Sequence, residues 1–133
     1  MYLESWVAAA YRDMGDYETS LREYLQAEKA LGGAPQSGLA LTYSLMGREN
    51  DARDVMRRMD ERARTNYVPY VARAMVHATL GDLDVAVKLF EQAVEKRETL
   101  LFGFKNLPPM APLLADSRAR RILEQAEAMR KTK

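Results

Sequence analysis

The sequence predicts an all-α protein whose 133 residues form a single domain of repeated helical hairpins. In residues 71–94, apolar residues recur at helical spacing on both sides of a glycine, which is the pattern of two amphipathic helices joined by a turn. Gly15, Gly47 and Gly81 lie 32 and 34 residues apart, so the same unit occurs three times. Most of the seven glycines and five prolines fall at expected helix boundaries, which favours an all-α chain.

The first hairpin is predicted over residues 2–14 and 17–31. In its first helix, one apolar stripe is expected to face the core; it consists of Trp6, Val7, Ala10 and Met14. The inward residues of its second helix are expected to be Leu21, Tyr24, Leu25, Ala27, Ala30 and Leu31. Gly15 ends the first helix, and the run Gly32-Gly33-Ala34-Pro35 separates this hairpin from the next one.

The second hairpin is predicted over residues 35–46 and 50–64. Its core stripes are expected to be Leu39, Ala40, Tyr43 and Met46 on the first helix and Ala52, Val55, Met56 and Met59 on the second. We expect Asn50 or Asp51 to cap the second helix. The charged outer face of that helix is expected to be solvated, with Asp54 paired to Arg58 four residues later.

The third hairpin is predicted over residues 68–80 and 83–97, with Gly81 ending the first helix and Asp82 capping the second. A short helix over residues 98–105 is then expected to dock Leu101, Phe102 and Phe104. The prolines of residues 106–112 prevent a continuous helix there. Asp116 or Ser117 is expected to cap a final helix over residues 117–130, whose inward residues are Ile122, Leu123 and Ala126.

Taken position by position, the chain resembles tetratricopeptide repeats. The matching residues are Val7, Ala8, Tyr11, Tyr24 and Ala27 in the first repeat, Leu39, Ala40, Tyr43, Ala52 and Met56 in the second, and Tyr70, Ala74, Ala86, Phe90 and Ala93 in the third. In the first repeat, Ser20 stands where the motif has alanine. This resemblance implies a right-handed α-solenoid of three hairpins, with repeats at about 1–33, 34–66 and 67–98 and a C-terminal capping segment at 99–130. It also implies a scaffold for protein–protein interaction.

Residues 67–126 are similar to the end of repeat arrays in bacterial regulators that carry winged-helix, kinase or cyclase domains. The residues that carry this resemblance are Pro109, Pro112, Leu113, Asp116 and Arg118. The chain departs from the pattern at Met110, Ala111, Ser117 and Ala119. The resemblance implies a capped piece of a larger regulatory protein, since the end of a solenoid needs a cap.

Composition argues against several other functions. The net charge of +1 gives no bulk attraction for nucleic acid, and the basic residues near the C-terminus are expected to be a solvated face. The chain has no cysteine, no apolar run of membrane-spanning length and no signal peptide, so we expect a cytoplasmic protein without a membrane contact. His77 is the only histidine, and Glu91, Glu95 and Glu98 are expected to be solvated, so we expect no metal, no cofactor and no enzymatic activity.

By motif position, the resemblance places a concave binding groove on the first helix of each hairpin. Its expected lining residues are Tyr2, Ser5, Ala9, Arg12, Ser37, Leu41, Ser44, Leu45, Val71, Met75, Ala78 and Thr79. These residues lack the lysine and asparagine of a terminal-carboxylate clamp, so the expected partner is an amphipathic helix or an extended apolar peptide.

Three alternatives stay open at this stage. In the first alternative, residues 98–115 or a neighbouring copy of the chain fill the groove. In another, the chain is a structural or self-association domain that forms homo-oligomers, because Trp6 and Val7 would be partly uncovered at the start of the array. Arg73 lies between Tyr70 and His77, and it either extends along the helix pair or reaches a carboxylate.

Overall fold

A computed structural model describes residues 5–98, 101 and 105–131. Regular structure in these residues is helical throughout, with no strand, so the predicted all-α helical repeat fold is confirmed. No helix among them combines the length and the apolar character needed to cross a membrane. The chain divides into two compact units, Met1–Val68 and Pro69–Lys133.

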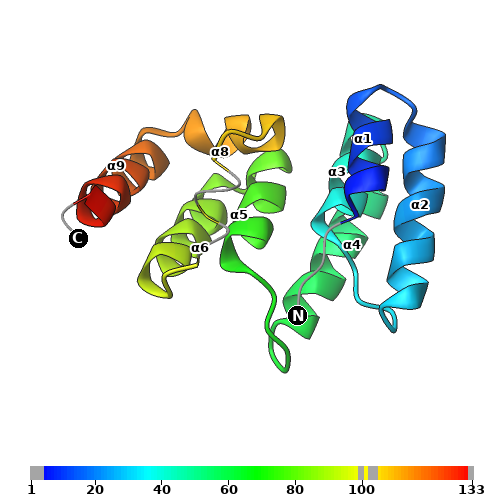
Figure 1. Cartoon of the computed structure of the whole chain (residues 1–133), viewed down its shortest axis with the longest axis horizontal. Helices are drawn as coiled ribbons and strands as arrows, with labels where there is room; N and C mark the ends of the chain where they lie inside the picture. Colours follow the sequence, from blue (N-terminus) through cyan, green and yellow to red (C-terminus); the bar gives the residue numbers. More distant parts are fainter. Residues whose placement is uncertain (1–4, 99–100, 102–104, 132–133) are drawn as a thin grey trace. The chain divides into compact units, whose positions relative to one another are not determined.

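The first unit contains two helical hairpins (Figure 1). Within each hairpin the two helices pack together, the second helix of the first hairpin packs against the first helix of the second, and the two first helices also touch. The helices are α1 (Trp6–Asp13), α2 (Tyr17–Ala30), α3 (Ser37–Leu45) and α4 (Glu49–Arg62).

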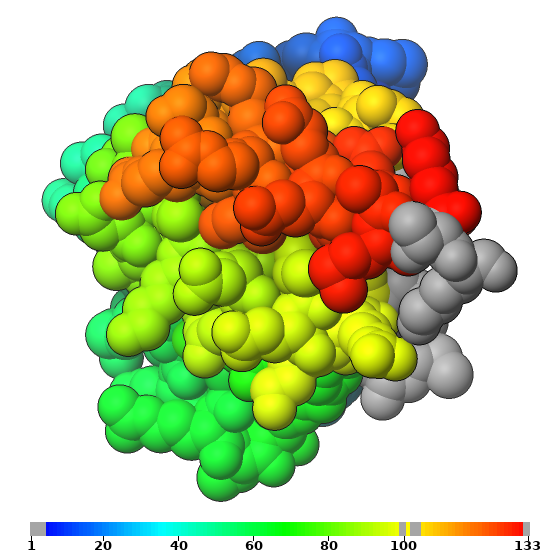
Figure 2. Space-filling view, turned by 90° about the vertical axis from the view of Figure 1, so that its left-hand side faces the viewer, coloured from blue at the N-terminus to red at the C-terminus, as the bar shows by residue number. Residues whose placement is uncertain are grey.

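The second unit contains one hairpin and a C-terminal cover. In sequence order its elements are α5 (Tyr70–Thr79), α6 (Leu83–Glu95), the 3-10 turn η1 (Pro108–Met110), α8 (Ala111–Leu114) and α9 (Ser117–Lys131). Both η1 and α8 pack against α5. α9 packs against α6, and Figure 2 shows this contact between the orange-red atoms of α9 and the yellow-green atoms of α6. The predicted short helix at 98–105 falls largely on residues outside the described part; Phe102 and Phe104 are among them, and Leu101 is buried.

The turns of the three hairpins are alike, as the glycine spacing predicts. Gly15, Gly47 and Gly81 have φ angles of 86°, 76° and 89°, in the left-handed region that only glycine adopts at little cost. After each glycine, the next backbone N–H donates to a carbonyl of the preceding helix at 2.9 Å; the pairs are Asp16 to Tyr11, Arg48 to Tyr43 and Asp82 to His77. The prediction that these glycines lie at bends is therefore confirmed.

Small residues lie where the two helices of each hairpin meet. Six such side chains are fully buried at the positions that the repeat pattern assigns to them: Ala8 and Ser20, Ala40 and Ala52, and Ala74 and Ala86. Small side chains let two helix backbones approach closely, and a larger residue then fills the space beside them. Tyr24, Met56 and Phe90 are the larger residues, and each is buried.

The prediction for the core-facing side of α1 was wrong. Trp6, Val7 and Met14 are 66%, 58% and 70% exposed, and Ala10 is exposed as well. These residues do form a stripe, but the buried side of the helix consists of Ala8, Ala9 and Arg12. The reason is that the close contact with α2 uses the small side of α1, which lies opposite the large apolar residues.

Two helix caps differ from the prediction and one agrees with it. The carboxylate of Asp116 accepts the N–H of Arg118, as predicted, and that of Asp16 accepts the N–H of Thr19 at the start of α2. Asp82 makes no cap bond and instead lies 3.2 Å from His77 Nδ1. At α4 neither Asn50 nor Asp51 is the cap, because that helix already begins at Glu49, with Arg48 in the N-cap position.

The core predictions for α2 and α9 were only partly correct, whereas the one for α4 was correct. In α2, Leu21 and Tyr24 are buried, but Leu25 is 44% exposed and Ala30 is exposed. In α9, Ala126 is buried, whereas Ile122 and Leu123 are only half-buried. The four buried residues predicted for α4 are all confirmed: Ala52, Val55, Met56 and Met59.

Candidate functional site

A buried hydroxyl holds three helices of the first unit together. Ser20 Oγ on α2 donates to the carbonyl oxygen of Ala8 on α1 at 2.8 Å, and it lies 3.2 Å from Thr42 Oγ1 on α3. Thr42 Oγ1 in turn donates to the Gly38 carbonyl at 2.9 Å. Every polar atom of this cluster is therefore bonded without water, and the register of α1, α2 and α3 is fixed by it.

The predicted groove residues of α1 lie beside α3. The backbone N–H of Ser5 donates to Gln36 Oε1 at 3.0 Å, which ties the start of α1 to the start of α3. Ser5 is half-buried, and Ala9 and Arg12 are buried. Arg12 donates from Nη1 to the Tyr24 hydroxyl at 3.2 Å, so its guanidinium is held inside the hairpin. Tyr2 lies outside the described residues.

The predicted groove residues of α3 range from buried to open. Ser37 and Leu41 are buried, Ser44 is half-buried, and Leu45 is 56% exposed. α1 packs against α3, and the hydrogen bond from Ser5 to Gln36 joins the starts of the two helices. Leu41 and Ala9 are buried, and among the described candidate residues of these two helices only Leu45 is exposed.

The predicted groove residues of α5 are covered. Val71, Met75 and Ala78 are buried, and Thr79 is half-buried. The Thr79 hydroxyl donates to the carbonyl oxygen of Met75 at 3.0 Å. This part of the predicted groove is therefore not open to a partner in the described structure.

The proline-rich segment contributes to that covering. η1 and α8 pack against α5, and their side chains Met110 and Leu113 are fully buried. The alternative in which residues 98–115, or a neighbouring copy, fill the groove stays a prediction.

Glu98 is the largest departure from the sequence interpretation. It was expected to be solvated, but it is only 6% exposed, and its carboxylate accepts the backbone N–H groups of Tyr70 at 2.7 Å and Val71 at 2.9 Å. α5 begins after Pro69 with no side-chain cap of its own, so Glu98 supplies the missing acceptors from 28 residues away. The sequence held one sign that α5 needs a distant cap: no Ser, Thr, Asp or Asn stands directly before its first residue.

The residue before Glu98 has a strained backbone conformation. Arg97 follows α6 with a φ of 54°, in the place that glycine takes after the first helix of each hairpin. The N–H of Glu98 then donates to the carbonyl oxygen of Ala93 at 3.0 Å, which closes the helix end. This closure directs the Glu98 carboxylate at the start of α5.

The side chains at the centre of α5 have structural partners. His77 Nδ1 lies 3.2 Å from Asp82 Oδ2, which links the helix to the turn that follows it. The Arg73 guanidinium lies over the Tyr70 ring, 5.9 Å from its centroid, so it follows the helix surface. Both residues therefore help to shape the hairpin.

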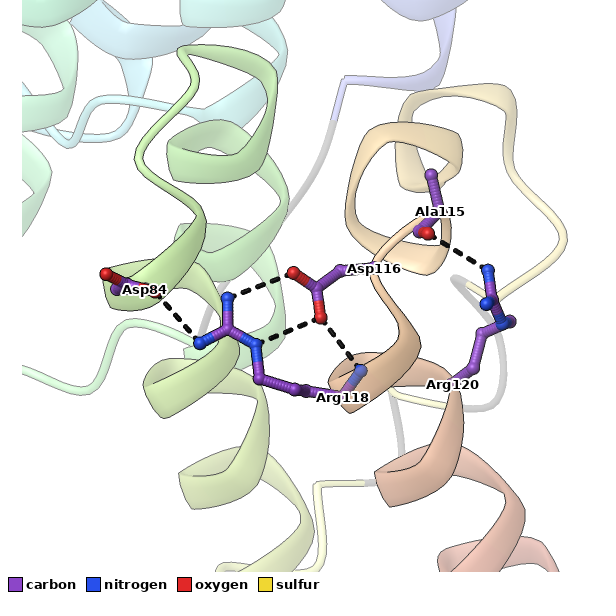
Figure 3. A network of polar contacts seen from close by, with 5 residues as sticks. All are labelled: Asp84, Ala115, Asp116, Arg118 and Arg120. Carbon is purple, nitrogen blue, oxygen red and sulfur yellow. Dashed lines mark hydrogen bonds and ion pairs between the residues drawn. The ribbon is translucent and has the colours of Figure 1, made fainter.

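A polar network joins α9 to α6 at the C-terminal cover (Figure 3). Arg118 binds the Asp116 carboxylate from Nε at 3.1 Å and from Nη2 at 3.0 Å, and it reaches Asp84 Oδ1 from Nη1 at 2.9 Å. The hydrogen bond from the Arg118 side chain lowers the pKa of Asp116 to about 2, and the two carboxylates raise the pKa of Arg118. Arg120 donates from Nη1 to the carbonyl oxygens of Leu114 and Ala115, so two arginines of the basic cluster bind the protein itself.

The comparison with protein families identifies one repeat. The family model for the tetratricopeptide repeat matches residues 69–97, which include α5, its glycine turn and α6. No curated protein and no solved structure gives a significant match to the chain. The third hairpin is thus a tetratricopeptide repeat, a unit of arrays that present binding surfaces to other proteins.

Proposed function

We propose that the first unit binds an amphipathic helix or an extended apolar segment of a partner protein through the side formed by α1 and α3. The single observation that supports this best is Leu45, a large apolar side chain left exposed on the first helix of a hairpin. Ser44, the residue before it, is half-buried and offers a polar contact at the rim of an apolar patch. Leu41 lies one turn before Leu45 on α3 and is buried, so we place it beneath the patch.

The experiment selects binders from a displayed library of helical and extended peptides and measures their affinity for two variants. Leu45→Glu places a charge on the proposed surface. Leu25→Glu is the matched control, because Leu25 is an exposed leucine on α2 in the same unit. The proposal expects Leu45→Glu to weaken binding at least tenfold and Leu25→Glu to leave it unchanged. Peptides that bind both variants equally well would refute the groove assignment.

We also propose that the chain belongs to a larger, cytoplasmic bacterial regulator with a winged-helix, kinase or cyclase domain. The support is the resemblance at Pro109, Pro112, Leu113, Asp116 and Arg118, together with the packing of α8 and α9 over the hairpin that precedes them. A cap of this kind suits the end of a repeat array. The sequence that flanks this chain in its gene tests the proposal, since it must encode such a domain.

The alternative is a self-association domain that forms homo-oligomers. The exposed residues of α1, Trp6 and Val7, favour it because apolar side chains on a surface are frequent at oligomer contacts. Sedimentation of the chain over a wide concentration range distinguishes the two. A strict monomer at high concentration rules the alternative out.

A further inference from the structure

Each hairpin turn brings two side-chain positions together. They belong to the residue four positions before the turn glycine and to the residue directly after it, and a backbone hydrogen bond of 2.9 Å joins the two residues in all three turns. In the second hairpin, the Arg48 guanidinium lies over the Tyr43 ring, 4.7 Å from its centroid. In the third hairpin the two residues are His77 and Asp82, and their side chains lie 3.2 Å apart. The residue before the glycine can therefore bind the side chain that follows it.

An aspartate after the turn glycine has two available partners. Asp16 and Asp82 have nearly the same backbone conformation, with φ and ψ of −88° and 74° in the first and −86° and 64° in the second. Asp16 accepts the N–H of Thr19 at 3.2 Å and so caps α2. The equivalent donor of α6 is the N–H of Val85, but Asp82 makes no cap bond and lies against His77 instead. The first hairpin has a tyrosine where the third has this histidine, and that difference accounts for the choice of partner.

The charge of His77 changes with pH near neutrality. An imidazole gains or loses its proton between about pH 5 and pH 8. His77 lies in the last turn of α5, where the carbonyl groups at the helix end favour a positive charge. A protonated ring binds a carboxylate more strongly than a neutral ring does, because the hydrogen bond is then between two charged groups. The hold of His77 on Asp82 should therefore weaken when the ring loses its proton.

The other charged groups around α5 have different positions or partners. η1 and α8, which pack against α5, contain no titratable side chain. On α5 itself, Arg73 lies one turn before His77 and opposes a second positive charge. Glu98 binds the N–H groups at the opposite end of α5. The charged residues of α6 are all exposed; they are Asp84, which binds Arg118 at 2.9 Å, Lys88, Glu91 and Glu95. Asp82 is therefore the carboxylate that we expect to respond to His77.

We propose that the turn of the third hairpin is a protonation switch, in which His77 and the start of α6 compete for the Asp82 carboxylate. Protonated His77 holds the carboxylate and leaves the Val85 N–H uncapped. When His77 loses its proton, the carboxylate turns to that N–H and caps α6, as Asp16 caps α2. The switch does not involve the peptide-binding surface of the first unit, and so it goes beyond the proposed function.

Nuclear magnetic resonance of the full chain tests the switch at single residues. His77 is the only histidine, so the imidazole signals report its protonation without overlap. Exchange of the Val85 amide proton with water, corrected for the intrinsic effect of pH on exchange, reports whether that N–H is capped. The Thr19 amide in the same molecule is the matched control, because it is capped by an aspartate without a histidine opposite.

The proposal expects protection of the Val85 amide to rise several-fold between about pH 5.5 and about pH 7.5, with the same midpoint as the His77 ring signals. Protection of the Thr19 amide should stay constant over this range. Val85 protection that stays constant while His77 titrates would overturn the proposal. A His77 ring that keeps one protonation state throughout the range would overturn it as well.

Three variants distinguish the switch from a direct effect of the histidine charge on the Val85 amide. Asp82→Ala removes the carboxylate and keeps the histidine, so Val85 should be unprotected at every pH. His77→Tyr introduces the residue of the first hairpin, and Val85 should then be protected at every pH. His77→Gln adds no bulk and serves if the tyrosine variant does not fold; protection of Val85 should no longer depend on pH. If Val85 protection still follows pH in any of these variants, the proposal is overturned.

Discussion

Removing the carboxylate of Glu98 is expected to destabilise the second unit strongly. Glu98→Ala takes away the acceptors of two first-turn N–H groups of α5, those of Tyr70 and Val71. A hydrogen bond to a charged group contributes about 1.5–3 kcal/mol, and the first turn of a helix retains some access to water once its cap is lost. We therefore expect the free energy of unfolding of the second unit to fall by about 2–4 kcal/mol.

The amide protons of the two donors provide the most direct assay. A loss of about 2–4 kcal/mol corresponds to exchange with solvent that is about 30-fold to 1,000-fold faster in native-state hydrogen exchange. Glu98→Gln keeps one acceptor oxygen and should lose less than half of that stability. Thermal unfolding of the second unit should move down by about 10 °C or more for Glu98→Ala.

Glu91→Ala is the matched control, because it removes an exposed glutamate from α6 in the same unit. A surface substitution of this kind is expected to change stability by less than about 0.5 kcal/mol. If Glu98→Ala lowers stability no more than Glu91→Ala does, the assignment of Glu98 as the cap of α5 is refuted.

Three further substitutions have defined outcomes. Arg97→Gly should raise the free energy of unfolding by about 1 kcal/mol in urea titration, because the φ of 54° is strained for a side chain, and an unchanged midpoint would contradict this. Ser20→Ala should cost about 1 kcal/mol in the same assay, since Thr42 keeps its bond to the Gly38 carbonyl; a loss above about 3 kcal/mol would mean that an unsatisfied group had been left behind. The pKa of Asp116 is lower in the folded chain, about 2, than its ordinary value of 3.8, so its contribution to stability is present above that value and is lost as pH falls toward 2. Asp116→Asn should therefore make stability fall less steeply as the pH decreases from 3.8 to about 2. If stability depends on pH in the same way in the original chain and in Asp116→Asn, the coupling of Asp116 protonation to folding is refuted.

The helices and turns could be predicted because their causes are local. Gly15, Gly47 and Gly81 end helices through their own backbone freedom, and small residues such as Ala74 and Ala86 occur at a fixed spacing on each hairpin. These features need no knowledge of what lies elsewhere in the chain.

The orientation of α1 could not be predicted in the same way. The apolar stripe containing Trp6 is correct as a pattern, but a helix has two sides that can bury apolar area, and the close contact with α2 uses the small one, at Ala8. The burial of Glu98 had a different cause. Its partners are N–H groups 27 and 28 residues away, and no short motif records such a contact. The candidate groove was inferred from motif positions, which do not specify that η1 and α8 pack on α5.

Quenching of Trp6 fluorescence by acrylamide in the free chain tests the orientation of α1 most directly. It is the only tryptophan in the sequence, and its side chain is 66% exposed on α1. The account predicts emission near that of indole in water and efficient quenching in the folded monomer. Blue-shifted emission that resists acrylamide in the monomer would contradict it, because the stripe would then face the core.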